Sequence, residues 1–346
     1  MAKIAINGFG RIGRAFLKLA IDPAIAGAEL EIVAINDLGD LDYLAHLLKY
    51  DSAYGRYDKI VTIRTDGDKK YLNVSGREIL FLQEKDATKL PWGELAVDIV
   101  VEATGVFESY EKALVHKQAG AKRVILTAPS KDEDGSDAKT VLMGINVDDL
   151  KTCSMSSNAS CTTNSVSPVM QILSEKLGVK KAFLNTVHAY TATQMLVDGP
   201  TKSTDFRRGR AAAINIAPST TGAAVAVTKV LTNLVGKFDG MSLRVPVITG
   251  SISVITFISE KSTTVEEING ILKQAENDPR WQGIFRTTTE QIVSTDIIGE
   301  PCAALADLSL TKVVDGDLCT VFSWYDNEFG YTNTLVQHVI EVAKLI

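Results

Sequence analysis

The chain has 346 residues, of which 45% are hydrophobic and 23% are charged, and its formal net charge is −6. This composition excludes a disordered chain, a collagen and a coiled coil, and the length predicts about two domains of roughly 150 residues each. The mildly acidic balance argues against nucleic acid or an anionic membrane as the main partner. Because the sequence shows no secretory signal, long apolar run or CxxC pair, we expect a cytoplasmic protein with reduced thiols.

The N-terminal part of the chain alternates short apolar runs with helical patterns. Strands are predicted at residues 3–7, 31–36, 98–103 and 123–128, and a helix is predicted at residues 14–20. Continuous apolar strands separated by helices are typical of a doubly wound parallel sheet that is covered on both faces. Residues 60–82 hold alternating strands around an Asp-Gly turn, which predicts an antiparallel addition along one edge of the sheet.

The C-terminal part has strands with few helices between them. Strands are predicted at residues 182–191 and within the β-rich segment 241–258. A Thr-Val-Glu-Glu capping box at Thr264 predicts a helix that ends near Asn277, and an amphipathic helix is predicted over residues 326–346. This order predicts a second domain with a mostly antiparallel or mixed sheet backed by helices.

A glycine-rich segment follows the first predicted strand. Gly8, Gly10 and Gly13 form a G-x-G-x-x-G pattern that opens a helix, and the next strand ends at Asp37. The glycines allow a tight turn and a close approach of the backbone to a pyrophosphate, so the pattern predicts a Rossmann-type dinucleotide site. A carboxylate at Asp37 accepts the ribose hydroxyls and repels a 2′-phosphate, which favours NAD over NADP. The alternative is a glycine-rich turn with Asp37 as a cap of the strand.

A cysteine lies where a second helix is predicted to begin. Apolar residues at helical spacing follow Cys161, and Gly178 ends the pattern, although Pro168 must lie in the first turns or kink the helix. A free thiol with a pKa of about 8.5 is only about 3% ionised at neutral pH. The helix dipole stabilises the thiolate in part, and a charged imidazole must supply the rest.

Four histidines are candidates for that imidazole. His46 and His116 lie in helix-like segments beside charges, and His338 lies on the terminal helix. His188 lies at the end of a predicted strand in the second domain, so elimination makes it the best partner for Cys161. The alternative is a buried structural cysteine and a histidine satisfied within the core.

Segments in order along the chain resemble the motifs of phosphorylating glyceraldehyde-3-phosphate dehydrogenases: INGFGRIGR, SNASCTTN, TVHAYT, STTG, GMSLRVP and WYDNEFGYTN. The resemblance runs from residue 3 to the C-terminus. It implies a Rossmann-type NAD-binding domain at residues 1–160 that residues 327–346 complete, a catalytic domain at residues 161–326, and a homotetramer. It also implies oxidation of D-glyceraldehyde 3-phosphate to 1,3-bisphosphoglycerate with NAD and inorganic phosphate, through a Cys161 hemithioacetal and thioester and with His188 as the base.

The same resemblance assigns binding residues. It implies cofactor contacts at Gly8, Gly10, Arg11, Ile12, Gly13, Asp37, Lys85, Thr104, Thr127, Asn327 and Tyr331. It implies a site for the substrate phosphate at Thr191, Thr193 and Arg244, and one for the attacking phosphate at Ser160, Thr162, Thr221 and Gly222. Taken alone, the Thr-Thr-Gly segment is also explained as a turn and Arg244 as a surface charge. No metal is expected.

One further segment matches the pattern of this family, and three positions depart from it. Gly199-Pro200 matches the NAD-type pattern of a loop that a neighbouring subunit presents to the adenosine. Ser165 replaces a frequent second cysteine, Phe329 a frequent tryptophan, and Lys85 a frequent arginine near the adenine. Two alternatives remain: an erythrose-4-phosphate dehydrogenase, which hydrolyses its thioester, and a catalytically idle binding protein of the same fold.

Overall fold

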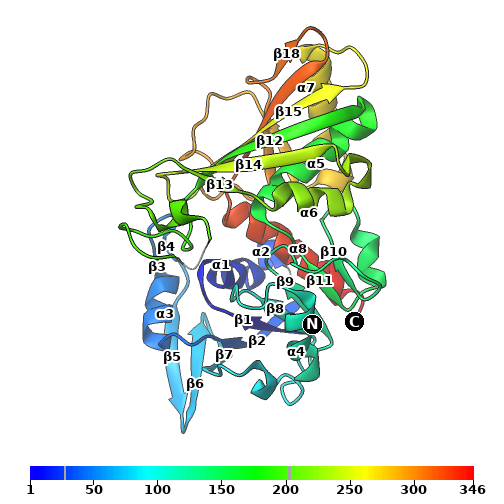
Figure 1. Cartoon of the computed structure of the whole chain (residues 1–346). Coiled ribbons are helices and arrows are strands. Elements are labelled where there is room, and N and C mark those ends of the chain that lie inside the picture. The colour runs from blue at the N-terminus through cyan, green and yellow to red at the C-terminus, as the bar shows by residue number, and fades with distance from the viewer. Residues whose placement is uncertain (27–28, 202–203) are drawn as a thin grey trace. The chain divides into compact units, whose positions relative to one another are not determined.

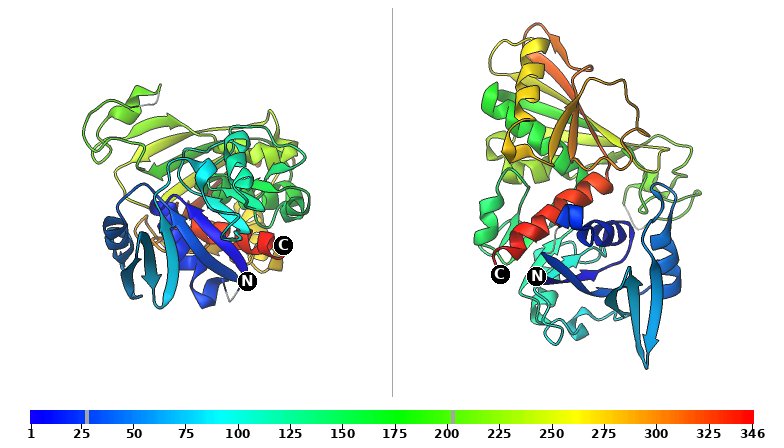
Figure 2. Two further views of the ribbon diagram at one scale, coloured as in Figure 1. Left: turned by 90° about the horizontal axis from the view of Figure 1, so that it is seen from below. Right: turned by 180° about the vertical axis from the view of Figure 1, so that it is seen from behind.

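The structure is a computed structural model that describes residues 1–26, 29–201 and 204–346. The chain divides into two compact units: Met1–Ala159 and Leu335–Ile346 form unit 1, and Ser160–Thr334 form unit 2. Figure 1 and Figure 2 show the course of the chain through each unit. None of the helices in the described part of the chain combines the length and apolar character that a membrane span requires.

Unit 1 contains a nine-stranded sheet with the order β10-β11-β9-β8-β1-β2-β7-β6-β5. Its strands are β1 (Ala2–Asn7), β2 (Leu30–Asn36), β5 (Val61–Asp66), β6 (Lys69–Val74), β7 (Arg77–Leu82), β8 (Ile99–Glu102), β9 (Arg123–Leu126), β10 (Ala138–Thr140) and β11 (Met155–Ser157). The strands from β10 to β7 pair in parallel, and β6 and β5 extend the edge in antiparallel pairs. The predicted parallel sheet with its antiparallel edge is confirmed.

Helices cover this sheet on both sides. The helices of unit 1 are α1 (Arg11–Ala20), α2 (Pro23–Ala26), α3 (Leu41–Lys49), α4 (Tyr110–Gln118) and the C-terminal part of α8 (Phe329–Ala343); a short ribbon joins β3 (Tyr50–Asp51) to β4 (Gly55–Arg56). In Figure 1, α1 and α4 lie on opposite sides of β1 and β8. Every residue of β8 is buried, which explains why such strands read as continuous apolar runs in the sequence. α1 begins directly after Gly10, earlier than the predicted start at residue 14.

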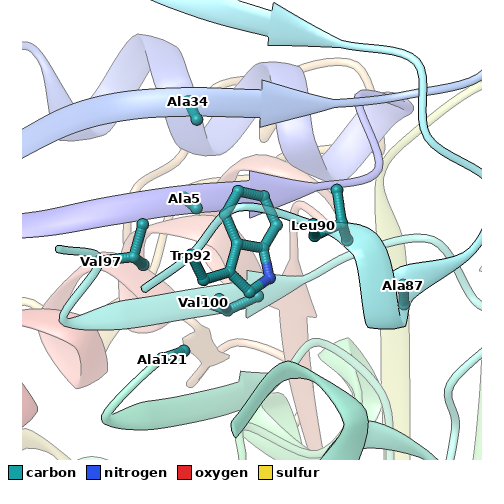
Figure 3. Packing of buried hydrophobic residues seen from close by; sticks show 8 residues of the cluster. All are labelled: Ala5, Ala34, Ala87, Leu90, Trp92, Val97, Val100 and Ala121. Atoms are coloured by element: carbon teal, nitrogen blue, oxygen red, sulfur yellow. The ribbon is translucent and has the colours of Figure 1, made fainter. Parts of the chain in front are cut away.

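Part of the unit 1 core surrounds Trp92, whose side chain is fully buried. Figure 3 shows the indole beside Ala5 of β1 and Val100 of β8, with Leu90 and Val97 around it. The small side chain of Ala5 leaves room for a large ring in a close-packed interior. The ring anchors the segment between β7 and β8 to the sheet, and removing it would cost about 3–5 kcal/mol.

Unit 2 is built on a second sheet with the order β13-β14-β12-β15-β19-β17-β16, and β18 pairs with β19 off this path. Its elements are α5 (Cys161–Lys176), β12 (Val179–Ala189), β13 (Ala217–Thr220), α6 (Ala223–Val230), β14 (Phe238–Val245), β15 (Ser251–Ser259), α7 (Val265–Ala275), β16 (Phe285–Thr288), β17 (Ala304–Asp307), β18 (Lys312–Val314) and β19 (Leu318–Tyr325). Two pairs, β12–β14 and β16–β17, are parallel, and the others are antiparallel. The predicted mostly antiparallel or mixed sheet is confirmed.

Some predicted elements differ in detail from the observed ones. The β-rich segment 241–258 is two strands, β14 and β15, which pair with opposite edges of β12. Pro246 and Gly250, whose φ is +93°, lie between the two strands and interrupt the β-structure. The last helix starts at Phe329 rather than at residue 326, because the Asp326 carboxylate accepts hydrogen bonds from the backbone N–H groups of Glu328 and Phe329. Pro168 lies inside α5, beyond its first turn.

The predicted cap of α7 is half formed. Thr264 Oγ1 accepts a hydrogen bond from the backbone N–H of Glu267 at 3.2 Å, as a capping box requires. The Glu267 carboxylate instead accepts a hydrogen bond from the hydroxyl of Thr263 at 2.8 Å. The helix therefore begins where the sequence predicts, with only one of the two reciprocal bonds.

Candidate active site and nucleotide pocket

Cys161 is the first residue of α5, and a constrained turn leads into it. Ser160 caps the helix, since its Oγ accepts a hydrogen bond from the backbone N–H of Thr163 at 3.1 Å. Ala159 has a φ of +52°, a left-handed conformation that costs a residue with a Cβ about 1–2 kcal/mol. Backbone strain of this kind is concentrated at functional sites, where the surrounding structure holds it. The turn presents the thiol at the N-terminus of α5.

The imidazole of His188, near the end of β12, faces this thiol. Cys161 Sγ lies 3.3 Å from His188 Nε2. His188 is 3% exposed, and the ring of Tyr325 packs edge-on against it with the ring centroids 5.8 Å apart. The two residues that elimination paired in the sequence are thus brought together.

The second ring nitrogen of His188, Nδ1, lies between a group that only accepts and a group that only donates: the Ala189 carbonyl oxygen at 2.7 Å and Arg244 Nη1 at 2.6 Å. The carbonyl oxygen accepts a hydrogen bond from Nδ1 in the tautomer that carries its proton there. A proton on Nδ1 leaves the lone pair of Nε2 directed at the thiol, as a general base requires. Arg244 Nη1 donates to the same carbonyl oxygen at 3.1 Å and lies 2.6 Å from Nδ1, so the guanidinium charge faces the imidazole.

Burial and Arg244 together control the ionisation of this pair. The pKa of His188 is lowered to about 3, first by burial of the ring and then by the charge of Arg244. Burial raises the pKa of the Cys161 thiol, while the charge of Arg244 and hydrogen bonds from Thr162 act in the opposite direction. The resting pair is therefore a neutral thiol beside a neutral acceptor. The sequence argument placed the stabilising charge on the imidazole, but in the structure the cation is Arg244.

Tyr325 adds a buried hydroxyl that the sequence analysis did not identify. Its OH lies 2.9 Å from Thr162 Oγ1 and 2.8 Å from Thr186 Oγ1, and burial raises the pKa of Tyr325 well above its ordinary value. A buried tyrosine usually has such a partner, but no local pattern predicts which one. The Thr162 hydroxyl is therefore held by a buried partner, and both this hydroxyl and the backbone N–H of Thr162 stabilise the Cys161 thiolate.

A cluster of hydroxyl and guanidinium groups follows β12. Thr191 Oγ1 and Thr193 Oγ1 are 2.9 Å apart. Arg208, which the sequence analysis missed, donates from Nη1 to Thr193 Oγ1 at 3.2 Å and from Nη2 to Ser219 Oγ at 3.0 Å. The pKa of Arg244 is lowered mainly by burial, and the charge of Arg208 contributes. Guanidinium groups that oppose each other in this way favour a bound anion.

The other predicted phosphate residues lie at helix N-termini. Ser160 caps α5, and Thr221 and Gly222 lead into α6. Thr221 Oγ1 accepts a hydrogen bond from the backbone N–H of Ala223 at 3.2 Å. A Cβ on Gly222 would meet nothing within 4 Å, so space is open beside this turn. Backbone N–H groups at a helix start favour an anion.

Unit 1 carries the glycine-rich turn beside a cavity of about 440 Å³. The predicted cofactor residues among those that line it are Gly8, Gly10, Asp37, Lys85 and Thr104. Gly8 has a φ of +98°, and a Cβ there would lie 2.6 Å from the backbone of Ala103 and Thr104. A Cβ on Gly13 would collide with the carbonyl oxygen of Gly8, whereas the space beside Gly10 is open. These are the three roles that the G-x-G-x-x-G pattern predicts: a tight turn, an open approach and close helix packing.

The Asp37 carboxylate also supports the glycine turn. Its Oδ2 accepts a hydrogen bond from the backbone N–H of Phe9 at 2.6 Å, and Oδ1 accepts one from Gly39 at 2.8 Å. Each oxygen has a second lone pair for a ligand hydroxyl. Asp37 therefore fixes the turn and faces the cavity at once.

Other predicted cofactor residues do not direct their side chains into this cavity. The Arg11 guanidinium pairs with Asp51 at 2.6 Å, and the Thr127 hydroxyl donates to the carbonyl oxygen of Glu102 at 3.0 Å. Ile12 and Gly13 lie in the first turn of α1. Arg11 and Ile12 therefore have only their backbone N–H groups at the helix start to offer a pyrophosphate.

The remaining predicted cofactor residues lie in unit 2. Asn327 is 6% exposed, and its Oδ1 accepts hydrogen bonds from the backbone N–H of Gly250 at 3.1 Å and from Ser251 Oγ at 3.0 Å. The amide is thereby oriented, and its Nδ2 is the end that can donate to a ligand carbonyl. Tyr331 is buried on α8.

All four cysteines are free thiols. In residues 1–26, 29–201 and 204–346, no group of three or more His, Cys, Asp or Glu side chains could hold a metal ion.

Comparison with known proteins covers nearly the whole chain. Residues 2–110 match the family model described as "Glyceraldehyde 3-phosphate dehydrogenase, NAD binding domain", and residues 160–327 match "Glyceraldehyde 3-phosphate dehydrogenase, C-terminal domain". The chain is similar to the glyceraldehyde-3-phosphate dehydrogenase of Thermotoga maritima, with 48% identity over 346 residues and 100% of both chains covered. The glyceraldehyde-3-phosphate dehydrogenase of Clostridium pasteurianum is 45% identical over 349 residues, which cover 100% of this chain and 99% of that one. The glyceraldehyde-3-phosphate dehydrogenase of Geobacillus stearothermophilus is 45% identical over 346 residues, which cover 99% of this chain and 98% of that one.

Proposed function

The chain belongs to the glyceraldehyde-3-phosphate dehydrogenase family and is an NAD-dependent oxidoreductase, and we propose that it oxidises D-glyceraldehyde 3-phosphate to 1,3-bisphosphoglycerate with inorganic phosphate. It would act in glycolysis or gluconeogenesis. The observation that carries this proposal is the 3.3 Å contact between Cys161 Sγ and His188 Nε2 at the start of α5. Arg244 and the Thr191–Thr193 pair supply groups for a phosphorylated substrate beside it.

The neutral pair performs the first step by moving one proton. His188 Nε2 takes the thiol proton as Cys161 Sγ attacks the aldehyde carbon, and returns it to the aldehyde oxygen to give a hemithioacetal. During this step the charge of Arg244 and the N-terminus of α5 stabilise the thiolate. The backbone N–H of Cys161 and the His188 side chain are the donors for the oxygen.

The oxidation and the phosphate step follow on the same residues. Bound NAD⁺ would supply the acceptor for the hydride, with its electron pair, that leaves the hemithioacetal carbon. His188 Nε2 accepts the hydroxyl proton at the same time, and a thioester remains on Cys161. Inorganic phosphate then attacks the thioester carbon, the carbon–sulfur bond breaks, and the departing Cys161 sulfur takes the proton from His188. The acyl phosphate leaves, and the proton of the phosphate passes to solvent.

The residues present fit NAD and phosphate. Asp37 faces the cavity of unit 1 with a lone pair on each oxygen for the ribose hydroxyls, and Lys85 lines the same cavity for the adenine. Nδ2 of Asn327, set by its Gly250 and Ser251 partners, suits the carboxamide oxygen of the nicotinamide. We assign the substrate phosphate to Thr191, Thr193 and Arg244, with Arg208 added. We assign the site of the attacking phosphate to Ser160, Thr162, Thr221 and Gly222.

A single-turnover experiment tests this chemistry. Mixed with NAD and glyceraldehyde 3-phosphate without inorganic phosphate, the enzyme should release a burst of NADH equal to the number of active sites. Mass spectrometry of the quenched protein should find the acyl group on the peptide that holds Cys161. Cys161→Ala should give neither burst nor adduct, whereas Cys153→Ala, the same change at a second free thiol, should keep both. The proposal fails if the wild-type protein binds NAD and forms no adduct.

We also propose that the enzyme is a homotetramer in the cytoplasm. The strands of unit 2 leave one sheet face partly uncovered: along β15, buried residues alternate with half-buried ones. Large apolar side chains gather on that face: Phe183, Met241, Val254, Ile258, Leu318 and Phe322. A hollow of about 750 Å³ borders it. An apolar face of this kind is typical of a contact between copies of one chain.

The alternative activity differs in whether turnover requires inorganic phosphate. An erythrose-4-phosphate dehydrogenase hydrolyses its thioester and needs no inorganic phosphate for turnover. The relatives named above all carry the glyceraldehyde-3-phosphate dehydrogenase name, which does not favour the alternative. An idle binding protein of the same fold would give no NADH burst.

A further inference from the structure

A buried carboxylate and a buried imidazole lie in contact beneath the nucleotide cavity of unit 1. Glu102, the last residue of β8, is 3% exposed, and His116 on α4 is 0% exposed. Glu102 Oε2 accepts hydrogen bonds from Asn7 Nδ2 at 2.6 Å and from His116 Nε2 at 2.9 Å. Glu102 Oε1 accepts from the backbone N–H and the hydroxyl of Thr104. Four donors thus converge on one carboxylate, which satisfies a buried acid.

Trp92 fixes the direction of the hydrogen bonds. An indole N–H can only donate, and Trp92 Nε1 donates to His116 Nδ1 at 3.2 Å. The proton of the imidazole is therefore on Nε2, from which it is donated to Glu102. The chain of bonds runs in one direction, from Trp92 through His116 to Glu102, and both nitrogens of a neutral imidazole are satisfied. Figure 3 shows how the indole is held among small core residues.

The bonds continue from Glu102 to the cavity wall. Asn7 Oδ1 accepts a hydrogen bond from Asn36 Nδ2 at 2.8 Å. Asn36 in turn bonds the backbone of Glu84 in both directions, at 2.9 and 3.0 Å. Asn7, Asn36, Glu84 and Thr104 all line the cavity, whereas Glu102 and His116 do not reach it.

The network also bears on the glycine turn. A Cβ at Gly8 would lie 2.6 Å from the backbone of Ala103 and Thr104, so the turn packs directly on the segment that Glu102 holds. A shift of Thr104 would move the surface against which Gly8 lies. Binding sites need such support, because small displacements of a wall residue weaken binding strongly.

We propose that Glu102 and His116 are positioning residues that hold the polar wall of the nucleotide cavity and thereby determine the affinity for NAD. They touch no ligand and act through Asn7, Asn36 and Thr104. This inference rests on the proposed placement of NAD in this cavity. It assigns a function to the only buried histidine–carboxylate pair in the described part of the chain.

Glu102→Gln tests the network with the smallest change of shape. One oxygen becomes an amide NH₂, and this donor then faces other donors, from Asn7 and His116 or from Thr104. We expect the Kd for NAD, measured by calorimetry, to rise by about tenfold or more, since bonds to a charged partner are lost. At saturating NAD, kcat and the KM for glyceraldehyde 3-phosphate should stay within about twofold of the wild-type values.

Substitutions at His116 separate positioning from simple loss of stability. His116→Leu removes both hydrogen bonds and should weaken NAD binding as Glu102→Gln does. His116→Gln keeps a donor for Glu102 and an acceptor for Trp92, and should restore the Kd to within about threefold of wild type. The matched control is His338→Leu, since His338 is also fully buried in unit 1 and bonded at both ring nitrogens, to Ser156 and Asn158. This control should leave the Kd for NAD unchanged.

Each outcome decides the inference. A folded Glu102→Gln protein with wild-type affinity for NAD overturns it, and so does a His338→Leu protein that loses affinity equally. If Glu102→Gln does not fold, Trp92→Phe is the deciding variant. Loss of the indole donor no longer fixes the His116 proton on Nε2, which should weaken NAD binding several-fold. Unchanged affinity for NAD would then overturn the inference. Because Kd is measured without the aldehyde, these results stand apart from the proposed reaction, which fails if wild-type protein binds NAD but does not oxidise the substrate.

Discussion

Arg244 Nη1 lies 2.6 Å from Nδ1 of His188, on the ring nitrogen that does not face the thiol. The guanidinium is therefore close enough to act on both members of the Cys161–His188 pair through its charge. It lowers the pKa of His188 further than burial alone and opposes the rise that burial causes in the pKa of Cys161. A residue that the family resemblance assigns to a phosphate contact thus also controls the nucleophile.

Replacing Arg244 with leucine should make the thiol less reactive. Without the cation, the pKa of Cys161 rises, so less thiolate is present at any pH below that value. We expect the rate of alkylation of Cys161 by iodoacetamide at pH 7 to fall by about tenfold, and its pH profile to move to higher pH. Arg207→Leu, at an exposed arginine paired with Asp205, is the control and should not change the profile. Equal or faster alkylation in Arg244→Leu would contradict this electrostatic role.

Replacing Asp37 with alanine should erode the preference for NAD. The carboxylate holds the glycine turn through Phe9 and is available to ribose hydroxyls, and its charge repels a 2′-phosphate. We expect the ratio of kcat/KM for NAD to that for NADP to fall by about tenfold or more. Asp40→Ala removes the same charge nearby, at the cap of α3, and should leave the ratio unchanged. An unchanged ratio in Asp37→Ala would show that the carboxylate does not discriminate.

The buried histidine of α8 predicts a pH dependence of stability. Burial lowers the pKa of His338 to about 3, whereas an unfolded histidine has a pKa of about 6.5. Between these values the unfolded chain binds a proton that the folded protein does not, so the free energy of unfolding is highest above about pH 6.5 and falls towards pH 3, by at most about 1.4 kcal/mol per pH unit for this group.

Urea denaturation of His338→Leu isolates that contribution. The variant loses the bonds to Ser156 and Asn158 and should be less stable than wild type at pH 7. At pH 5 the gap should be smaller by about 2 kcal/mol, because wild type alone carries the cost of a neutral buried ring. His46→Gln, at an exposed histidine, should show no such change. A gap of equal size at both pH values would refute the linkage.

The apolar face of the unit 2 sheet predicts the effect of a charge placed there. Phe322 lies opposite Val254 across β19 and β15, and both are half-buried. Phe322→Asp should convert a tetramer into smaller species at micromolar concentration, as seen by sedimentation velocity, since a charge that a contact buries is costly. Glu266→Gln, at an exposed site on α7, serves as the control. A wild-type protein that sediments as a monomer would contradict the proposed homotetramer.

Local patterns predicted the parts of the site that depend on neighbours in the sequence. Gly8, Gly10 and Asp37 follow from strand–turn–helix spacing, and the helix start near Cys161 follows from the apolar periodicity after it. His188 required elimination among four histidines, because nothing local points its ring at a thiol 27 positions away. The structure supplies that contact through β12.

Contacts between distant elements could not be predicted. Arg208 reaches Thr193 from another loop, and its neighbour Arg207 is an equal candidate by sequence. The Glu102–His116 pair joins the end of β8 to α4, and the sequence shows His116 only as one polar residue of a helix-like segment. The parallel pairing of β12 with β14 was equally hidden, since strand periodicity carries no direction.

The most direct test of the account is the dependence of steady NADH formation on inorganic phosphate. Purified protein is assayed with NAD and glyceraldehyde 3-phosphate, with and without phosphate, and erythrose 4-phosphate is run in parallel. The account predicts sustained turnover only when phosphate is present, because only phosphate releases the thioester from Cys161. Sustained turnover without phosphate would show hydrolysis of the thioester and contradict the proposed reaction.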